Sequence, residues 1–512
     1  MYQRIDNSDW SYEKAAHLLS RASMRANRDD RIALFELGRD QGVEAAVDSL
    51  VDPVDDWNRF PFPDWWDSKE TAGGPSGSVL GSEDDFVQWY AQQLCQANPL
   101  GAKMFKFFVD HAPVDGRPLL QQNRYIYLFQ HFDLCRRNAL GNFRAFIEEL
   151  TWDGAMMWML DMKNSVRGAI NENFGRELLE LFTLGVSGGY TEEDVVACSR
   201  AFTGRFTPAK QPDDWPYAPY LNQTQWPPVP HLDHYYLYID TDEMEILGQS
   251  ISGFTPDDEG ETRTNHGPEV LDIIFQQPAS GEYLVWKLWR YFVSPDPPEE
   301  LVKILGERFR TEYGFELRPL LKDLFLAEDF YKQENLGNQI KDAGDFFVSC
   351  THALDVALPN PRLTFLSLEA MGYQVMAPPN IAGWPEPIGE GNGWLGAEKV
   401  LFRVNLPPLW LEPTMTMFDR TGGGSGRSLY EVSPPDDFDL RKIVPSHLRG
   451  RRNLDLLLDE LNDRFLPFHR FSGEQRDFLI GHYERNFREL EEETVIREMI
   501  RLVMALPEFQ LQ

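Results

Sequence analysis

The chain has 512 residues, of which 42% are hydrophobic and 25% are charged, values typical of a folded globular protein rather than a disordered one. Its 49 Lys and Arg residues are outnumbered by 81 Asp and Glu residues, which gives a formal net charge of −32 at pH 7. Because nucleic-acid binding relies on basic side chains that neutralise phosphates, this charge argues against DNA or RNA as partners, and equally against an anionic membrane surface.

Apolar residues recur at helical spacing along most of the chain, so the sequence predicts an all-α protein with one large multi-helix body. The first expected helix covers residues 11–22 and begins after the capping residue Ser11. Alternation of period two is scarce, and only residues 235–239 indicate a short strand. The other expected helices cover residues 30–50, 84–111, 119–150 (two helices, broken near 139–141), 268–276, 281–293, 299–312, 318–330, 342–356, 453–465, 473–489 and 491–506.

Long segments rich in Pro, Gly and Trp interrupt the helical pattern. We expect residues 1–512 to form one helical domain, with a loop at 51–83, an aromatic and acidic insertion at 205–262, and a linker-like insertion at 406–450. A further loop covers residues 376–398. Loops of this length are commonly lids or binding segments. Their Trp rings can stack on sugars or fill a partner's pocket, or fold back onto the helical body.

The cysteines and the N-terminus give no sign of disulfides, zinc or export. Cys95, Cys135, Cys198 and Cys350 are too far apart for a zinc ribbon or a redox motif, and we expect free, buried thiols. No basic start followed by an apolar run is visible, so no signal peptide is predicted and the chain as written is expected to be cytoplasmic. No stretch of about 18 apolar residues predicts a transmembrane helix.

The densest motif, NENFGRELLELFTLGVSGGYTEEDVVACSRAFTGR at residues 171–205, predicts a pair of capped helices. Asn171 or Asn173 can cap the first helix. Thr191 caps the second, with Asp194 three residues later in the reciprocal position of a capping box. Each helix has an apolar face, so the motif predicts a helical hairpin with one side buried.

A strip of charged residues runs along the first helix of this motif. Glu172, Arg176, Glu177 and Glu180 fall on one side of it, opposite the apolar face. Carboxylates at this spacing can share a cation or shift each other's pKa, so Glu172 and Glu177 are candidate catalytic groups and Arg176 would tune them. The alternative is an ion-paired surface, because Arg176 lies four residues from both Glu172 and Glu180.

Histidines supply the other half of a candidate metal site. His17 and His111, together with Glu177 and Glu180, are the residues expected to ligate a divalent metal ion if one is bound. His17 lies on the apolar side of its helix, where a hydrogen-bonded core histidine is the alternative. A His-x-x-His pair at 231–234 lies in an aromatic loop and could hold a metal weakly, or simply be solvated.

A set of segments spread over most of the chain points to one family. The NENFGRELLELFTLG and YTEEDVVACSRAFTG segments are its core, and the others, in chain order, are HLLSRAS (17–23), RRNALGNFRAFIEELTWDGAMMWMLD (136–161), KLWRYFV (287–293), IKDAGDFFVSCTHAL (340–354), PPNIAGWPEPIGEGNGWL (378–395) and PEFQLQ (507–512). Together they resemble the bacterial DUF1800 family, a domain of unknown function.

The resemblance implies a mostly helical fold and a bacterial origin, and it implies no activity. Members are often exported and are often encoded beside a sulfatase-like protein, which implies a joint role at the cell surface or on a polymer such as a polysaccharide. The family tends to have histidines where this chain has Asn138 and Ile239. The positions that match the family pattern are His17, Asn171, Glu172, Asn173, Arg176, Glu177, Asp194, Lys287 and Trp384.

Two functions therefore remain open from the sequence. The first is an accessory or complex-forming protein that acts with a sulfatase-like partner on or near a cell-surface polymer. The second is a metal-dependent or acid/base enzyme built on the Glu and His residues around the NENFGRE helix.

Overall fold

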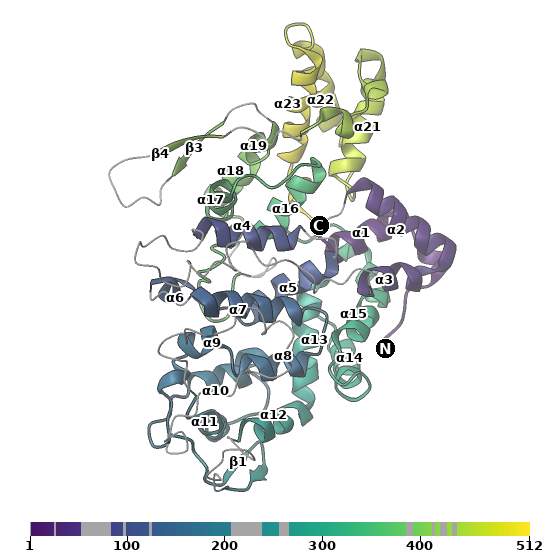
Figure 1. Cartoon of the computed structure of the whole chain (residues 1–512). Coiled ribbons are helices and arrows are strands. Elements are labelled where there is room, and N and C mark those ends of the chain that lie inside the picture. The colour runs from purple at the N-terminus through teal and green to yellow at the C-terminus, as the bar shows by residue number, and fades with distance from the viewer. Residues whose placement is uncertain are drawn as a thin grey trace.

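Helices make up nearly all of the ordered elements, which confirms the all-α prediction (Figure 1). The computed structural model describes residues 2–24, 27–52, 83–95, 99–121, 125–205, 238–254, 266–385, 393–411, 415–419, 428–432 and 438–512. Within these ranges the strands form only two short antiparallel hairpins. None of the described helices is both long and apolar enough to cross a bilayer.

The first half of the described chain contains α1 (Tyr12–Ala22), α2 (Arg28–Gln41), α3 (Val43–Val51), α4 (Glu83–Leu94), α5 (Pro99–His111), α6 (Arg117–Gln121), α7 (Tyr125–Arg137), α8 (Phe143–Leu150), α9 (Gly154–Met159), α10 (Asn173–Glu177), the π-helix η6 (Leu178–Thr183), α11 (Glu192–Ala201), β1 (Met244–Ile246) and β2 (Gln249–Ile251). The second half contains α12 (Gly267–Gln276), α13 (Pro278–Phe292), α14 (Glu299–Thr311), α15 (Leu317–Leu326), α16 (Ala343–Ala353), α17 (Pro361–Ala370), α18 (Ala397–Asn405), α19 (Pro408–Leu411), β3 (Met415–Asp419), β4 (Ser428–Val432), α20 (Leu440–Ile443), α21 (Leu454–Phe465), α22 (Gly473–Asn486) and α23 (Glu492–Met504).

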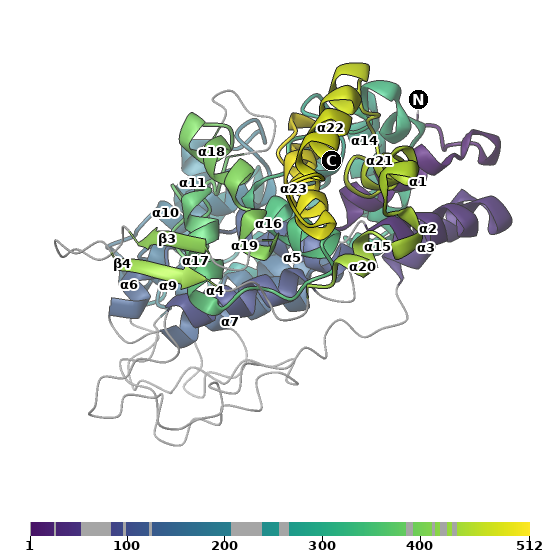
Figure 2. The same cartoon turned by 90° about the horizontal axis from the view of Figure 1, so that it is seen from above.

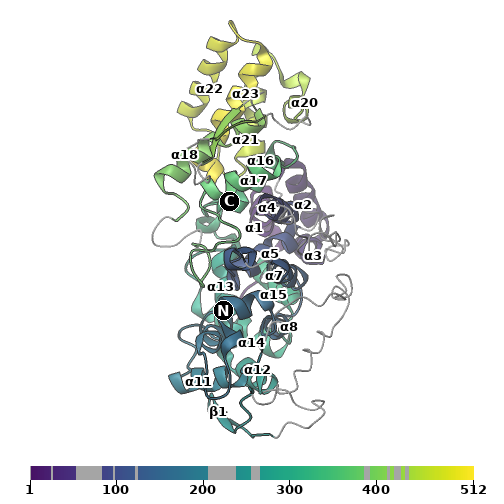
Figure 3. The ribbon, with the colours of Figure 1, turned by 60° about the vertical axis from the view of Figure 1, so that its left-hand side comes forward.

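The helices are arranged along one long axis, as Figures 1 and 3 show. At one end lie α21, α22 and α23, and at the other lie α10, α11 and the β1–β2 hairpin. Between them, α4, α5, α7, α13 and α16 form the middle of the molecule, with α1, α2 and α3 to one side. Seen from above, α22 and α23 lie over this middle part (Figure 2). One continuous apolar core runs from Ile5 near the N-terminus to Phe509 near the C-terminus.

Several expected long helices are divided. Residues 30–50 form α2 and α3, because the chain turns at Gly42, whose φ of +96° favours glycine. Residues 84–111 likewise form α4 and α5. The helices α17 and α18 were not predicted. Asn360 caps α17 by accepting a hydrogen bond from the Leu363 N–H.

The expected insertions contain some regular structure. The segment 205–262 contributes the β1–β2 hairpin, and 406–450 contributes α19, the β3–β4 hairpin and α20. Most of the expected strand at 235–239 lies outside the described residues, as do the histidine pair at 231–234 and nearly all of the 51–83 loop. The four cysteines are free, as predicted; Cys95 is half-buried and the other three are buried.

Candidate functional site

The predicted pair of helices is present as α10, η6 and α11; α11 is capped as expected, whereas the N-cap residue of α10 is Glu172, which makes no side-chain capping bond. Asn171 Oδ1 accepts the Asn173 N–H at 2.9 Å just before α10, which satisfies one of the free donors of the helix start. Thr191 and Asp194 form the predicted capping box of α11: the Thr191 hydroxyl accepts the Asp194 N–H, and the Asp194 carboxylate accepts the Thr191 N–H at 2.8 Å. Gly185, with a φ of +80°, follows the end of η6.

The two helices approach closely because α10 contains Gly175. A Cβ at this position would collide with the Ser199 hydroxyl on α11, so glycine is required for the packing. Next to it, Phe174 and Phe202 pack edge to face with their ring centroids 5.2 Å apart. Asp194 also accepts the backbone N–H of Leu247 at 2.5 Å, which ties α11 to the β1–β2 hairpin.

The charged strip lies on the surface of this helical hairpin. Arg176 makes a bidentate pair with Glu192 on α11, with N–O distances of 2.9 and 2.7 Å, and a longer one with Glu172 at 3.4 Å. Glu172 and Glu192 are exposed. The ion-paired alternative is thus the arrangement found for Arg176, although its main partner is Glu192 rather than Glu180. Glu177 is half-buried, and burial, followed by the nearby Glu180, raises its pKa.

A π-helical turn connects the strip to the interior. In η6 the Leu184 N–H donates to the Leu179 carbonyl, five residues earlier, and this wider turn ends with the carbonyl of Phe182 facing the core. His111, the last residue of α5, lies 3.1 Å from that carbonyl through Nε2. Its Nδ1 lies 3.0 Å from Nζ of Lys287 on α13. Because an ammonium only donates, Nδ1 accepts, and His111 is a neutral ring with its proton on Nε2.

Lys287 and Trp384, which the sequence places almost a hundred residues apart, line the same small cavity. It has a volume of about 40 Å³ and lies between α5, α13, the start of α16 and the 376–398 loop. Lys106 and Asp110 of α5 line it on one side. The aromatic wall consists of Phe107, Tyr291, Tyr373, Trp384 and Trp394.

Asp110 is a carboxyl group of this cavity with a shifted pKa. Burial raises its pKa to about 6, although the charge of Lys287 acts in the opposite direction. Its carboxylate accepts the Trp384 backbone N–H at 2.7 Å. Gly383, with a φ of +93°, allows the loop to come this close, because a Cβ there would collide with the Asp110 carboxylate. A carboxyl group with a pKa near neutrality can either donate or accept a proton.

Buried ion pairs form the floor beneath the cavity. Lys106 pairs with Asp342, and Lys103, one turn earlier on α5, pairs with Asp345 at 2.7 Å. Burial alone would raise the pKa of Asp345, but Lys103 and Lys106 outweigh it and lower the pKa to about 2. These pairs fix α5 against the first turn of α16 and hold Asp110 in place.

The expected metal ligands are not brought together. His17 is fully buried on α1, where Nε2 lies 3.2 Å from the Phe330 carbonyl and the ring packs against the Phe330 ring. His17 is therefore a hydrogen-bonded core histidine, which was the alternative to a metal ligand in the sequence analysis. Both ring nitrogens of His111 are used by Phe182 and Lys287. Across the described ranges, no group of three or more His, Cys, Asp or Glu side chains could hold a metal ion.

An aromatic pair, of which Trp286 is exposed and Tyr283 half-buried, lies beside the helical hairpin. The rings of Tyr283 and Trp286 on α13 are stacked, with centroids 6.2 Å apart and an interplanar angle of 12°, and the Arg290 guanidinium lies 4.7 Å from the Trp286 ring centroid. A Cβ at Gly185 would touch the Tyr283 ring, so the loop after η6 packs directly on this pair. Val186, the next residue, is 75% exposed.

Asp110 and the buried lysines were missed by the sequence analysis, although a signal for them existed. In KMFKFFVDH, Lys103, Lys106 and Asp110 follow one another at spacings of three and four residues in an otherwise apolar helix. At these spacings the three charges share one face of the helix. Because the rest of the helix is too apolar to be exposed, this pattern indicates that the charges are buried and paired.

Comparison with known proteins gives one match. A family model described as "Protein of unknown function (DUF1800)" matches residues 17–511. No curated protein and no solved structure matches the chain.

Proposed function

We propose that this chain, which belongs to the DUF1800 family, is an accessory protein that acts in a complex with a sulfatase-like partner on or near a cell-surface polymer such as a polysaccharide. The observation that carries the proposal is the exposed surface around α10 and α11. We call it the partner surface and define it by Arg176, Val186, Glu192, Tyr283 and Trp286.

The charges of the partner surface contribute little to folding. The Arg176–Glu192 and Arg176–Glu172 pairs are at the solvent-facing side of the hairpin, and exposed pairs of this kind contribute little to stability. They can therefore exchange partners at small cost. A docking protein would find a fixed guanidinium surrounded by carboxylates, a pattern that selects for charge complementarity.

Exposed apolar groups lie on the loop that follows η6 and on α13, where Gly185 packs against Tyr283. Val186 is 75% exposed and Trp286 is 37% exposed, and they are linked through Gly185 and Tyr283. Protein interfaces commonly combine an aromatic centre with a polar rim that includes Arg. The residues of the partner surface include both kinds of group, with Trp286 and Tyr283 as the aromatic members and Arg176 and Glu192 as the charged ones.

Affinity purification of the tagged protein from its native cell, followed by mass spectrometry, tests this proposal. We expect a sulfatase-like protein to be recovered with the wild type and lost with Trp286→Ala and with Arg176→Glu. Phe478→Ala is the matched control, because Phe478 is 55% exposed on α22 at the other end of the molecule. Equal recovery with Trp286→Ala and Phe478→Ala would contradict the proposed surface.

A second candidate function, an acid/base enzyme, is supported by Asp110. Its pKa of about 6 suits proton transfer near neutral pH, and Lys287 lies in the same cavity to stabilise a negative charge. The indole N–H of Trp384 is buried in the cavity wall without a hydrogen-bond partner in the described chain, and it is available to a substrate oxygen. The chemistry here needs no metal ligand from the NENFGRE helix.

This second function is tested by incubating the purified protein with a panel of polysaccharides and measuring new reducing ends. Asp110→Asn should abolish any activity, and the wild-type rate should show an inflection near pH 6. Asp115→Asn is the matched control, because Asp115 lies just after α5 and pairs with Arg117 outside the cavity. Activity that survives Asp110→Asn would exclude Asp110 as the catalytic group.

A further inference from the structure

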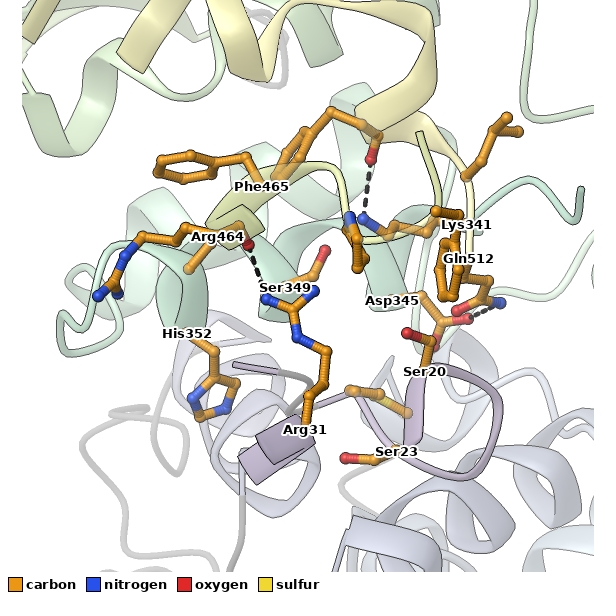
Figure 4. A pocket seen from close by; sticks show the side chains of 16 residues that line it. Ser20, Ser23, Arg31, Lys341, Asp345, Ser349, His352, Arg464, Phe465 and Gln512 are labelled. Atoms are coloured by element: carbon orange, nitrogen blue, oxygen red, sulfur yellow. Dashed lines mark hydrogen bonds between the residues drawn. The ribbon is translucent and has the colours of Figure 1, made fainter. Parts of the chain in front are cut away.

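A second cavity, of about 50 Å³, lies where α1, α2 and α16 meet the end of α21 and the last residues of the chain (Figure 4). Its polar lining includes Ser20 and Arg31 from the N-terminal helices, Lys341 and Ser349 from the region of α16, and Arg464 from α21. It lies away from α10 and α11 (Figure 1), so its role is independent of the partner surface.

Arg31 is the central feature of this pocket. The side chain is fully buried, and its Nη2 donates to the backbone carbonyls of Asp463 at 2.9 Å and Arg464 at 3.1 Å. Its Nε donates to the Asn27 carbonyl at 3.2 Å. Nη1 is buried and has no hydrogen-bond partner among the residues that the structure describes. Figure 4 shows the guanidinium extending into the middle of the pocket, beside Ser349.

Lys341 lies near Arg31, and it and two further cations also lack a carboxylate partner in the described chain. Lys341 donates to the Phe509 carbonyl at 2.8 Å, and Arg403, close to it, donates to the Lys341 carbonyl at 2.8 Å. Arg21 bonds a carbonyl and an amide oxygen. In the described part of the chain, none of these four cations forms an ion pair with an acidic side chain, although the protein as a whole carries an excess of acid.

The acidic side chain that reaches the pocket is already neutralised. Asp345 lines it, but this carboxylate pairs with Lys103 at 2.7 Å and lies 3.8 Å from Lys106. Arg31 and Lys341 are therefore left without an ion-pair partner among the described residues, although Asp345 attracts Lys341 from a distance. Burial lowers the pKa of Lys341 to about 8, which reflects the cost of keeping an unpaired charge at this place.

We propose that this pocket binds the oxyanion of a phosphate or sulfate group. A buried cation without a counter-charge is strongly unfavourable, and an oxyanion supplies both the negative charge and acceptors for the free donors. Arg31 Nη1 and the Lys341 ammonium are the charged donors, and Ser20 lines the pocket with a hydroxyl, whereas the Ser349 hydroxyl already donates to the Phe346 carbonyl at 3.0 Å. The volume equals that of a few water molecules and suits one tetrahedral group.

Thermal unfolding in inorganic phosphate or inorganic sulfate, at constant ionic strength set with chloride, tests the proposal. We expect saturable stabilisation of the wild type by either anion, as ligand binding to the folded state requires. Arg31→Gln should raise the apparent Kd at least tenfold. Arg452→Gln, at an exposed position, is the matched control and should leave the Kd unchanged. Equal effects of the two variants, or no response beyond chloride, would overturn the proposal.

A second variant keeps the test valid if Arg31→Gln does not fold. Ser349→Asp introduces a carboxylate beside Arg31, and it should stabilise the protein in phosphate-free buffer and abolish the response to phosphate. A Ser349→Asp protein that still responds to phosphate like the wild type would exclude this pocket.

A sugar phosphate and a sugar sulfate, titrated beside the inorganic ions, distinguish the two sources of the oxyanion. Tighter binding of the sugar ester indicates that the oxyanion is the end group of a larger ligand, and tighter binding of the inorganic ion indicates a free anion.

Discussion

Nζ of Lys287 lies 3.0 Å from Nδ1 of His111, so an ammonium group and a neutral imidazole share one hydrogen bond between α13 and the end of α5. The same ammonium lines the cavity that contains Asp110. Lys287 thus couples the Phe182 carbonyl of the NENFGRE segment, through His111, to the buried carboxyl group.

Replacing Lys287 should change two pKa values in the same direction. Lys287 lowers the pKa of both Asp110 and His111. For Asp110 it opposes the larger effect of burial, which raises the pKa, and for His111 it adds to the larger effect of burial, which lowers it. In Lys287→Met we expect the pKa of Asp110 to rise above about 6 and that of His111 to rise as well. NMR titration of the Asp110 carboxyl carbon and the His111 ring measures both. Lys303→Met, on the surface of α14, is the control; an unchanged Asp110 pKa in Lys287→Met would contradict the coupling.

The buried neutral histidine His17 should make the protein less stable in weak acid. Burial, with a further effect of Arg21, holds its pKa well below the ordinary value of 6.5, so the unfolded chain binds a proton that the folded one does not. The free energy of unfolding therefore rises with pH up to about 6.5, by at most about 1.4 kcal/mol per pH unit for one such group.

Urea denaturation between pH 5 and 7.5 measures this contribution. His17→Phe should reduce the slope below pH 6.5 relative to the wild type, because the ring that gains a proton on unfolding is gone. His447→Phe introduces the same ring at an exposed position and serves as the control. Identical slopes for the wild type and His17→Phe would show that His17 is charged in the folded protein.

Gly383→Ala should destabilise the protein and disturb Asp110. The residue has a φ of +93°, and its Cβ would collide with the Asp110 carboxylate. We expect a loss of about 1–3 kcal/mol in the free energy of unfolding, together with a higher Asp110 pKa if the Trp384 N–H moves away. Gly473→Ala, in open space at the start of α22, should have little effect. Equal stability of the two variants would argue against the close approach.

The capping box of α11 and a second one at the start of α22, formed by Ser472 and Gln475, allow a comparison of local and tertiary roles. Thr191→Ala and Ser472→Ala each remove a cap, and each should cost about 1 kcal/mol. Asp194→Ala should cost more, about 2–3 kcal/mol, because Asp194 also accepts the Leu247 N–H of the hairpin. Denaturant unfolding measures all three. A cost for Asp194→Ala no larger than that for Thr191→Ala would mean that the hairpin contact adds nothing.

Local signals predicted the helices and their ends well. Ser11 caps α1 and Thr191 caps α11 as expected, because capping depends on residues only three positions apart. The divisions within 30–50 and 84–111 were missed, since apolar periodicity continues on both sides of each turn. Helix α17 was missed as well, although Asn360 followed by Pro361 is a start signal.

The candidate site could be predicted only in part. Lys287 and Trp384 were marked by the family resemblance, and the structure places them in one cavity. Asp110 was not found, because its pKa depends on burial beneath a loop that lies 274 residues later in the chain. The ion-paired alternative for Arg176 was recognised from spacing along one helix, but its main partner, Glu192, belongs to the next helix.

The π-helical turn at 178–183 constrains the length of the NENFGRE segment as much as its composition. Five residues per hydrogen-bonded step, instead of four, shift the phase of the helix at this point. If the same residues were wound as an ordinary α-helix, everything that follows would be rotated by about 100°. Phe182 would then present its carbonyl away from His111, and Gly185 would lose its place against Tyr283. The extra residue of the π-helical turn thus keeps both the buried contact with His111 and the surface contact with Tyr283 in place.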